Sequence, residues 1–212
     1  MITPLAAPFV NDKLIEIILK NTGESKSFDV LDIACGKGYN SMVLISKRKN
    51  ARIDCVDIND RQFLVKDKNV KFRKADLNKG LSTDKKYDFI IATEIIEHLE
   101  NPHSFMRDCY NHLKIGGYLL MSTPNVDNIY SVLRRIIAGK PLYFSLDEPS
   151  GHISPVHLVT IKEILRIIGA KNYKIFYNRN VFPLFLGKWR LSTIPGNNRL
   201  FGEINLVVAR KN

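Results

Sequence analysis

Two glycines, Gly36 and Gly38, follow directly after a short apolar run that also carries an acid, Asp32. The run 30–33 has the composition of a buried strand, and paired glycines after such a strand are typical of a tight turn around a nucleotide-like ligand. Glycine is expected there because a side chain would hold the backbone away from the ligand, and because a tight turn often requires positive φ. The segment therefore predicts a strand that ends in a ligand-binding turn.

A second acid, Asp57, ends the next apolar run, nineteen residues after Gly38. In nucleotide-binding α/β folds, an acid at about this spacing ends the second strand, and its carboxylate accepts hydrogen bonds from the ribose hydroxyls. Position 41 is Ser41, so the third glycine or alanine of a dinucleotide fingerprint is missing, and the loop does not end in the Gly-Lys-Ser/Thr of a P-loop. The pattern favours an adenosine-containing cofactor, and Asp32 suits one with a cationic amino-acid tail.

These residues resemble the first motif of the class I S-adenosylmethionine-dependent methyltransferases, Asp/Glu-x-Gly-x-Gly-x-Gly, with Ala34 in place of the first glycine. Segments 74–77, 87–99 and 113–122 resemble later motifs of the family in the same order, and the dense resemblance covers residues 28–125. Strands that alternate with helices predict a parallel sheet with helices on both faces. The resemblance implies a Rossmann-like, doubly wound α/β fold with a seven-stranded sheet, mostly parallel, whose last strand, 203–210, runs antiparallel.

The resemblance also implies the cofactor and its contacts. S-adenosylmethionine is the expected methyl donor and S-adenosylhomocysteine the product. In the family, the acid at the position of Asp57 binds the ribose, and the acid at the position of Asp76 accepts a hydrogen bond from the adenine amino group. The expected cofactor-binding residues are Asp32, Ala34, Gly36, Gly38, Asp57, Ile58, Asp76, Leu77 and Thr93.

Two histidines are candidates for the catalytic base. His98 follows the fourth expected strand, near the place where an acceptor should lie, and His157 lies in a segment that resembles the family's loop over the acceptor. An imidazole at either place would take the proton that an oxygen or nitrogen acceptor loses. The alternatives stay open: His98 as a buttress of the following helix, and His157 as a residue that orients the acceptor or the loop.

Glu94, Glu97 and His98 also permit a metal site, because on a helix these three positions share one face. The pattern is similar to that of ubiquinone-biosynthesis O-methyltransferases. It is also similar to that of small-RNA 3′-end 2′-O-methyltransferases, in which a downstream histidine completes the site. His152 or His157 would take that position here. The same motif occurs in relatives for which no metal is implied, so no metal ligand is assigned and Mg²⁺ remains an alternative.

Length and composition indicate the number of domains and the class of protein. The chain has 212 residues, 45% of them hydrophobic, which predicts one domain over residues 1–212. Its formal net charge of +11 fits an acidic partner such as nucleic acid or anionic lipid, but the scattered basic residues without interleaved aromatics favour a solvated lysine-rich surface. Three cysteines do not suggest a disulfide framework, and neither a secretory signal nor a membrane-spanning run is evident. A cytoplasmic location is expected.

Two segments depart from a minimal domain of this family and are predicted insertions at the acceptor site. The first, 126–150, contains an apolar stripe at helical spacing beside Arg134, Arg135 and Lys140. This amphipathic helix is interpreted as a lid, as a helix in a membrane interface, or as an ordinary packed helix. The second, 181–201, is rich in large apolar residues and would close an acceptor pocket, pack against the lid or form a dimer contact.

The sequence thus predicts a methyltransferase that transfers a methyl group to an oxygen of a small-molecule or lipid-like acceptor. Two alternatives are kept. An RNA methyltransferase with a metal-assisted site would show a contiguous basic groove leading to Glu94 and His98. A cofactor-binding module without turnover would keep the fold and the cofactor contacts. The sequence leaves the acceptor, the methylated atom and the oligomeric state undetermined.

Overall fold

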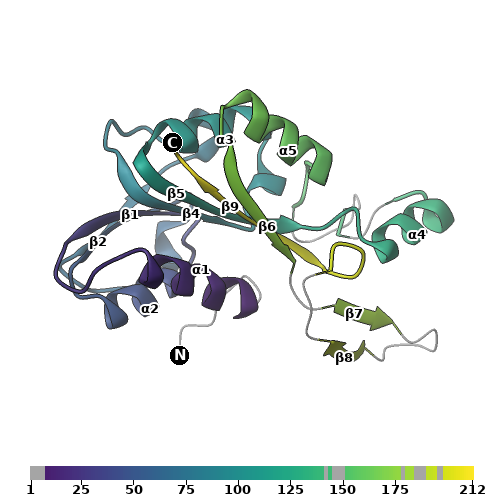
Figure 1. Ribbon diagram of the computed structural model, residues 1–212, viewed down its shortest axis with the longest axis horizontal. Helices are drawn as coiled ribbons and strands as arrows, with labels where there is room; N and C mark the ends of the chain where they lie inside the picture. Colours follow the sequence, from purple (N-terminus) through teal and green to yellow (C-terminus); the bar gives the residue numbers. More distant parts are fainter. Residues whose placement is uncertain (1–7, 141–142, 145–150, 178–179, 184–189, 195–197) are drawn as a thin grey trace.

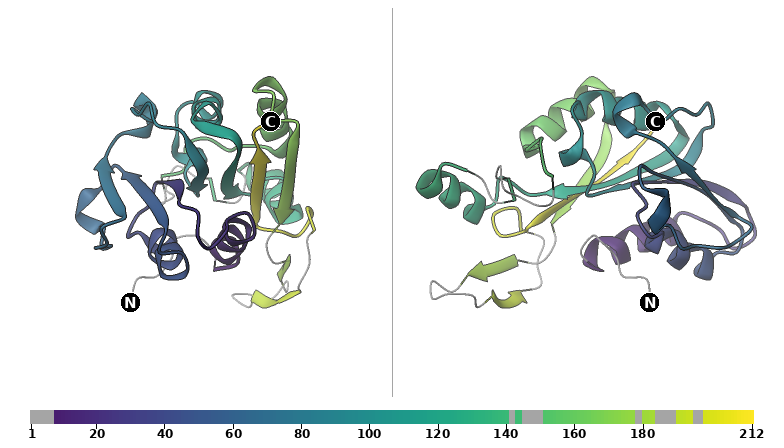
Figure 2. Two further views of the ribbon diagram at one scale, coloured as in Figure 1. Left: turned by 60° about the vertical axis from the view of Figure 1, so that its left-hand side comes forward. Right: turned by 180° about the vertical axis from the view of Figure 1, so that it is seen from behind.

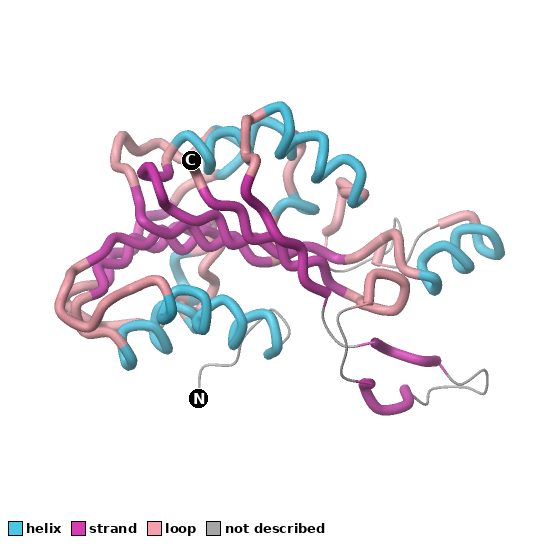
Figure 3. Tube along the Cα trace, in the orientation of Figure 1, coloured by secondary structure: helices cyan, strands magenta, loops and turns pink. Residues whose placement is uncertain are grey.

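The computed structural model describes residues 8–140, 143–144, 151–177, 180–183, 190–194 and 198–212. A central sheet lies between two layers of helices (Figures 1 and 3). Its strands are β1 (Phe28–Ile33), β2 (Ala51–Asp57), β3 (Val70–Lys74), β4 (Tyr87–Thr93), β5 (Leu113–Pro124), β6 (Asn172–Tyr177) and β9 (Ile204–Arg210). The α-helices are α1 (Pro8–Lys20), α2 (Tyr39–Lys47), α3 (Pro102–Asn111), α4 (Ile129–Ala138) and α5 (Leu158–Ile167). Three 3₁₀ turns are η1 (Asp60–Gln62), η2 (Leu77–Lys79) and η3 (Ile96–His98), and a separate hairpin is β7 (Asn180–Pro183) and β8 (Arg190–Ile194).

The sheet has the order β3-β2-β1-β4-β5-β9-β6. The pairs among β1 to β5 are parallel, whereas β9 runs antiparallel to both β5 and β6. This confirms the predicted seven-stranded, mostly parallel sheet with an antiparallel last strand. The strand order reverses between β1 and β4, and in open α/β sheets ligands bind beyond the carboxyl ends of the strands at such a point.

Each face of the sheet is covered by helices, as Figures 1 and 2 show. On one face, Leu14 and Ile18 of α1 are buried in a cluster with Val30. On the other, Met106 of α3 is buried in a cluster with Leu31. Every residue of β1 is buried, as expected for a parallel strand covered on both sides. Burying each large aliphatic side chain contributes about 1.5–3 kcal/mol to stability. This core therefore holds the strands, and with them the loops at their carboxyl ends, in place.

Local sequence signals account for the start of α3. Pro102 stands at the start of α3, and the Asn101 side chain accepts a hydrogen bond from the Ser104 N–H at 2.9 Å, as is typical of a helix N-cap. After Asp57 the sequence pattern also predicts a short helix around residues 60–66, but only the single turn η1 forms there. The chain after η1 is extended because Phe63 packs on the glycine loop, where a Cβ at Gly38 would lie 2.9 Å from its ring.

A buried acid at the amino end of the sheet gathers several cations. The carboxylate of Asp29 accepts two hydrogen bonds from Arg52, at 2.9 and 3.0 Å, and one from Lys114 at 2.9 Å. Lys85 lies 3.1 Å away. Burial by itself would raise the pKa of Asp29, but the hydrogen bonds from these three cations outweigh it and hold the pKa well below its usual range. The ionised carboxylate therefore ties β1 to β2 and β5.

Replacing this carboxylate should make the free energy of unfolding depend less on pH in the acidic range. Because the folded-state pKa of Asp29 is depressed, its contribution is fully present above the unfolded value of about 3.9 and is lost as pH falls through the folded pKa. Asp29→Ala should lower the free energy of unfolding by about 1–2 kcal/mol at pH 7, and the difference from wild type should shrink at pH 3. Urea unfolding at pH 7, 4 and 3 measures this. An equal difference at all three values would contradict it.

The two predicted insertions lie at one end of the molecule. The first contains α4, and the second contains the hairpin β7–β8; both extend from the sheet at the same end in Figure 1 and in the right view of Figure 2. Residues 141–142 and 145–150 of the first insertion, and 184–189 and 195–197 of the second, fall outside the described residues. Among the helices that the structure describes, none combines the length and the apolar character needed to cross a membrane.

Candidate active site

A cavity of about 420 Å³ opens at the carboxyl ends of β1, β2 and β4, where the strand order reverses. Its volume is in the range of cofactor pockets. Six of the nine residues predicted to bind a cofactor line it: Ala34, Asp57, Ile58, Asp76, Leu77 and Thr93. They come from the ends of four strands, so the sheet itself brings together residues that are far apart in the sequence.

The glycine loop makes a tight turn against β2. Ala34, Gly36 and Gly38 all have positive φ, at 52°, 53° and 84°. The Gly36 N–H donates to one carboxylate oxygen of Asp57 at 2.8 Å, and the Asn59 N–H donates to the other at 2.9 Å. An ionised carboxylate offers about four acceptor positions, so two of them remain for a ligand. Asp57 is thus held rigidly at the cavity wall.

Asp32, Gly36 and Gly38 are placed differently from the other predicted cofactor residues, because they are not among the residues that line the cavity. Asp32 is buried behind the loop, and the Ser41 hydroxyl donates to its Oδ2 at 2.6 Å. Burial raises the pKa of Asp32 to about 6, and its Oδ1 has no hydrogen-bond partner within the described ranges. These three residues position the loop from behind.

The far side of the cavity is formed by the turn after β3. The Asp76 carboxylate caps η2 by accepting a hydrogen bond from the Asn78 N–H at 3.0 Å, which fixes the acid at the cavity edge. Sequence reasoning missed several residues on the wall: Asn11, Cys35, Lys37, Tyr39, Asn40, Gln62, Asn78, Ile95 and Leu99. Asn40 carried a usable signal, because it is a polar residue only two positions after Gly38. The structure buries it in α2. Asn11 carried none, because α1 reaches the cavity only through tertiary packing.

Beyond β4 the chain leaves the strand sharply. Glu94 has a left-handed backbone with φ 50°, and only the single turn η3 follows it. The expectation that Glu94, Glu97 and His98 share one face of a helix is therefore wrong. The Ser122 hydroxyl instead holds the Glu94 carboxylate by donating to it at 2.6 Å.

A cluster of Glu97, His98 and His152 lies beside the cavity. One potential ligand atom from each residue lies within 4.8 Å of the others, and Glu97 Oε1 is 4.0 Å from His152 Nε2. The two imidazole rings meet edge to face with their centroids 4.7 Å apart. His98 also lines the cavity, so it joins the cofactor pocket to this cluster.

The hydrogen bonds of the cluster determine which atoms face its centre. His98 Nδ1 lies 3.2 Å from the Gly151 carbonyl, and His152 Nδ1 lies 2.8 Å from the Tyr143 carbonyl. A carbonyl only accepts, so each Nδ1 carries the proton in the neutral ring and each Nε2 keeps a lone pair. Glu97 Oε2 accepts from the Thr123 hydroxyl at 3.0 Å, whereas its buried Oε1 has no hydrogen-bond partner in the part of the chain described.

Burial shapes the protonation of these groups. It raises the pKa of Glu94 to about 7, and burial together with the neighbouring Glu94 charge raises the pKa of Glu97 to about 8. Burial, followed by the proximity of His152, lowers the pKa of His98. The His98 imidazole is therefore neutral at pH 7 and can accept a proton or bind a cation.

His157 is held elsewhere. Its Nδ1 lies 2.7 Å from Asp127 Oδ1, and the Leu158 N–H donates to the other oxygen of the same carboxylate at 2.7 Å. Its Nε2 lies 3.4 Å from Arg135. His157 thus stands at the start of α5, and it belongs neither to the cavity wall nor to the Glu97 cluster. Of the two histidines considered as the downstream metal ligand, His152 is the one in position.

Comparison with known proteins identifies the family. The family model described as a methyltransferase domain matches residues 7–175. A ubiquinone biosynthesis O-methyltransferase of Rickettsia felis is 30% identical over 135 residues, which cover 62% of this chain and 55% of that protein. A malonyl-[acyl-carrier protein] O-methyltransferase of Ilyobacter polytropus is 30% identical over 159 residues, which cover 70% and 55%. The chain thus spans about half the length of these curated relatives.

A solved structure agrees with these relatives. The crystal structure of a SAM-dependent methyltransferase from Archaeoglobus fulgidus aligns with a TM-score of 0.66 at 25% identity, covering 96% of this chain and 93% of that one. The cavity meets the requirements of such a cofactor through its position at the strand ends, its volume and the fixed carboxylate of Asp57. The chain therefore belongs to the methyltransferase-domain family, and its cofactor is S-adenosylmethionine.

Proposed function

We propose that this protein transfers a methyl group from S-adenosylmethionine to a hydroxyl oxygen of a small-molecule or lipid-like acceptor. When bound, the cofactor supplies a methyl group already activated for displacement, so the protein mainly has to align the reactants and remove the proton of the acceptor. The relatives named as O-methyltransferases support an oxygen acceptor. The observation that carries the proposal is the position of His98, which belongs to both the cavity wall and the Glu97 cluster.

The residues divide into two groups in this proposal. Asp57 and Asp76 hold the nucleoside at the glycine-loop side of the cavity. Ile95 and Leu99, which line the cavity together with His98, provide an apolar wall for an acceptor. His98 Nε2 is placed to take the proton of the attacking hydroxyl, because its Nδ1 is already oriented by the Gly151 carbonyl. His157 is assigned a positioning role at the start of α5.

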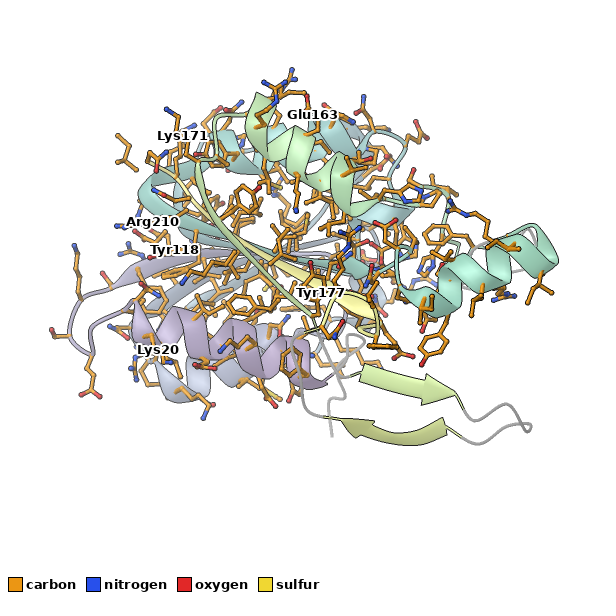
Figure 4. The ribbon with its side chains drawn as sticks, turned by 45° about the vertical axis from the view of Figure 1, so that its right-hand side comes forward. Lys20, Tyr118, Glu163, Lys171, Tyr177 and Arg210 are labelled. Carbon is orange, nitrogen blue, oxygen red and sulfur yellow. The ribbon has the colours of Figure 1, made fainter. Side chains whose placement is uncertain are left out.

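The RNA alternative receives little support. It requires a basic groove that leads to Glu94 and His98, yet Lys37 is the one lysine or arginine among the described residues that line the cavity. A wider set of basic residues, including Lys20, Lys171 and Arg210, lies at the end of the molecule opposite α4 (Figure 4). The proposal therefore keeps a small or lipid-like acceptor.

An acceptor panel tests the proposal. Purified protein with S-adenosylmethionine is given phenols, aliphatic alcohols, carboxylates and primary amines, and S-adenosylhomocysteine formation is followed. Methylation of phenols or alcohols is the expected result, with mass spectrometry locating the new methyl on oxygen. Methylation confined to amines would overturn the assignment to oxygen. Cofactor binding without turnover on any member would favour the binding-only module.

A second proposal, an alternative to His98 as the base, concerns a divalent cation at the Glu97 cluster, because the lone pair of His98 Nε2 can serve only one of the two roles. The buried Glu97 Oε1 lacks a partner among the described residues, and two imidazole Nε2 atoms are free to face it. Metal-ligating histidines usually donate their other N–H to a carbonyl or carboxylate, as both do here. Mg²⁺ prefers an all-oxygen shell, whereas two imidazoles and one carboxylate suit Mn²⁺, Fe²⁺ or Zn²⁺. A bound cation would lower the pKa of an acceptor hydroxyl.

Titration calorimetry with metals checks this expectation. Apo protein should bind Mn²⁺ or Zn²⁺ with one site per chain, and Mg²⁺ at least tenfold more weakly. Glu97→Gln should weaken Mn²⁺ binding by at least tenfold, because it replaces the charged carboxylate ligand with a neutral amide. His103→Ala is the matched control, since His103 is an exposed residue of α3. Equal Mn²⁺ binding by wild type and Glu97→Gln would contradict the cation site and leave His98 as the base.

A further inference from the structure

The helix α4 turns its apolar face to solvent. Val132 and Leu133 are each 41% exposed, Ile136 is 75% exposed and Ile137 is 83% exposed. Of the residues of α4, Ser131 is the one that the structure describes as buried. A packed amphipathic helix would bury its apolar stripe and expose its polar side. Here the sequence pattern of an amphipathic helix is present, but its apolar stripe is exposed instead of buried.

Helical geometry explains how the exposed side chains form one surface. At about 100° per residue, Ile129, Val132, Leu133, Ile136 and Ile137 fall on one side of the helix, with Ser131 on the other. Leu200 extends this surface: it is 53% exposed, and its carbonyl accepts a hydrogen bond from the Ile129 N–H at 2.8 Å. We call this set the α4 apolar face.

The base of α4 is firmly attached to the domain. The Asn128 side chain accepts a hydrogen bond from the Ser131 N–H at 2.8 Å and donates to the Asn125 carbonyl at 2.7 Å. Asn125 in turn donates to the carbonyls of Arg199 and Gly202, at 2.8 and 2.9 Å. From this base the helix extends away from the sheet, with side chains around it (Figure 4). Its presentation to solvent is therefore built into the fold.

The charges on this segment have a single sign. Arg134, Arg135 and Lys140 are the charged residues between 129 and 140, and the segment has no acid. On the helical projection, Arg134 and Arg135 flank the side opposite the α4 apolar face. Long basic side chains on the polar side of a helix can extend toward anionic groups while its aliphatic face is buried. Arg134 is available for this, whereas Arg135 also lies 3.4 Å from His157 Nε2. The chain as a whole carries a formal net charge of +11, which adds attraction to any anionic surface.

We propose that the α4 apolar face docks on the surface of an anionic lipid bilayer. In this arrangement the helix lies along the interface, its aliphatic side chains enter the boundary between headgroups and acyl chains, and its basic residues meet lipid phosphates. An exposed apolar face, on a helix whose charged residues are all cations, fits such a surface better than it fits water or a neutral protein patch. The proposal stands on α4 and its charges, independently of the methyl acceptor.

A second basic surface of the molecule serves as the control for vesicle binding. Lys13, Lys20, Lys171, Lys174 and Arg210 line a groove of about 520 Å³. The labelled residues Lys20, Lys171 and Arg210 lie at the opposite end of the molecule from α4 in Figure 4. This groove offers cations without a comparable exposed aliphatic helix. Ile115, which is 85% exposed beside Gly116, is close to Arg210, whose guanidinium donates to the Gly116 carbonyl at 3.3 Å.

Sedimentation with vesicles tests the proposal. Full-length protein should bind phosphatidylglycerol–phosphatidylcholine vesicles at least tenfold more tightly than pure phosphatidylcholine vesicles. The double variant Ile136→Ser/Ile137→Ser removes apolar area without adding charge, and it should lose at least tenfold in affinity for the anionic vesicles. Arg134→Gln/Arg135→Gln should reduce binding and its dependence on salt. Ile115→Ser and Lys171→Gln, at the other end, should bind as wild type does.

Three results would overturn the proposal. The first is unchanged binding by Ile136→Ser/Ile137→Ser. The second is loss of binding in Lys171→Gln with α4 intact, which would assign vesicle binding to the other basic surface. The third is a wild-type dimer in light scattering that becomes a monomer in the isoleucine double variant and does not bind vesicles, which would make the face a contact between two copies. Thermal unfolding of each variant verifies that the domain remains folded.

Discussion

Asp57→Ala should weaken S-adenosylmethionine binding by about 100-fold. The carboxylate lines the cavity, and its two oxygens are fixed by the Gly36 and Asn59 N–H groups, so it is already oriented to accept ribose hydroxyls. Two hydrogen bonds to a charged acceptor contribute roughly 3 kcal/mol or more together, and about 1.4 kcal/mol corresponds to a factor of ten. Calorimetric titration of the variant with S-adenosylmethionine measures the loss.

Two matched variants separate ligand contact from support of the loop. Asp57→Asn keeps one acceptor oxygen and the side-chain volume, and should lose about tenfold. Asp60→Ala removes the nearby acid of η1, whose carboxylate contacts Lys74 at 3.4 Å and which does not line the cavity. That variant should bind the cofactor as wild type does. Equal binding by Asp57→Ala and wild type would show that the carboxylate does not contact the ligand.

His98→Ala should reduce methyl transfer by at least about 100-fold while the dissociation constant for S-adenosylmethionine changes less than threefold. General base catalysis typically increases the reaction rate 10²–10⁴-fold, and the loss of a metal ligand would also lower the rate. His98 lines the cavity, where we assign it to the acceptor, whereas we assign the ribose contact to Asp57. Initial rates of S-adenosylhomocysteine formation, with an acceptor found in the panel, measure the effect.

The control for this variant is His103→Ala, which should keep the wild-type rate. His152→Ala adds a second comparison, because His152 belongs to the cluster but is not among the residues of the cavity wall. A rate loss in His98→Ala with no loss in His152→Ala would favour His98 as the base. A similar loss in both would favour the cation. Wild-type turnover in His98→Ala would exclude His98 from the chemistry.

The fold and the cofactor side of the site could be predicted because their signals are local. The run before Gly36 is apolar, its acid and glycines follow in fixed spacing, and Asp57 ends the next strand. Parallel strands place such ends on one edge of the sheet, so the sequence order of Asp57, Asp76 and Thr93 translates directly into one cavity wall.

The catalytic side could not be predicted in the same way, because it depends on how distant segments meet. His152 reaches Glu97 through backbone hydrogen bonds from Ile153 and Ser154 to the Glu97 carbonyl, a contact that no sequence spacing indicates. The sequence predicted a helix that includes Glu94, but the left-handed backbone at this residue is incompatible with one. The stripe in α4 predicted an amphipathic helix, but a periodic pattern does not indicate which side faces the domain.

The most direct test of the central claim is calorimetric titration of the wild-type protein with S-adenosylmethionine and with S-adenosylhomocysteine. The account predicts that both bind at one site per chain, with dissociation constants in the range from roughly 1 μM to 1 mM that is usual for enzyme substrates. It also predicts that the two compete for that site. Absence of binding by either compound up to about 1 mM would contradict the assignment of the cavity to this cofactor.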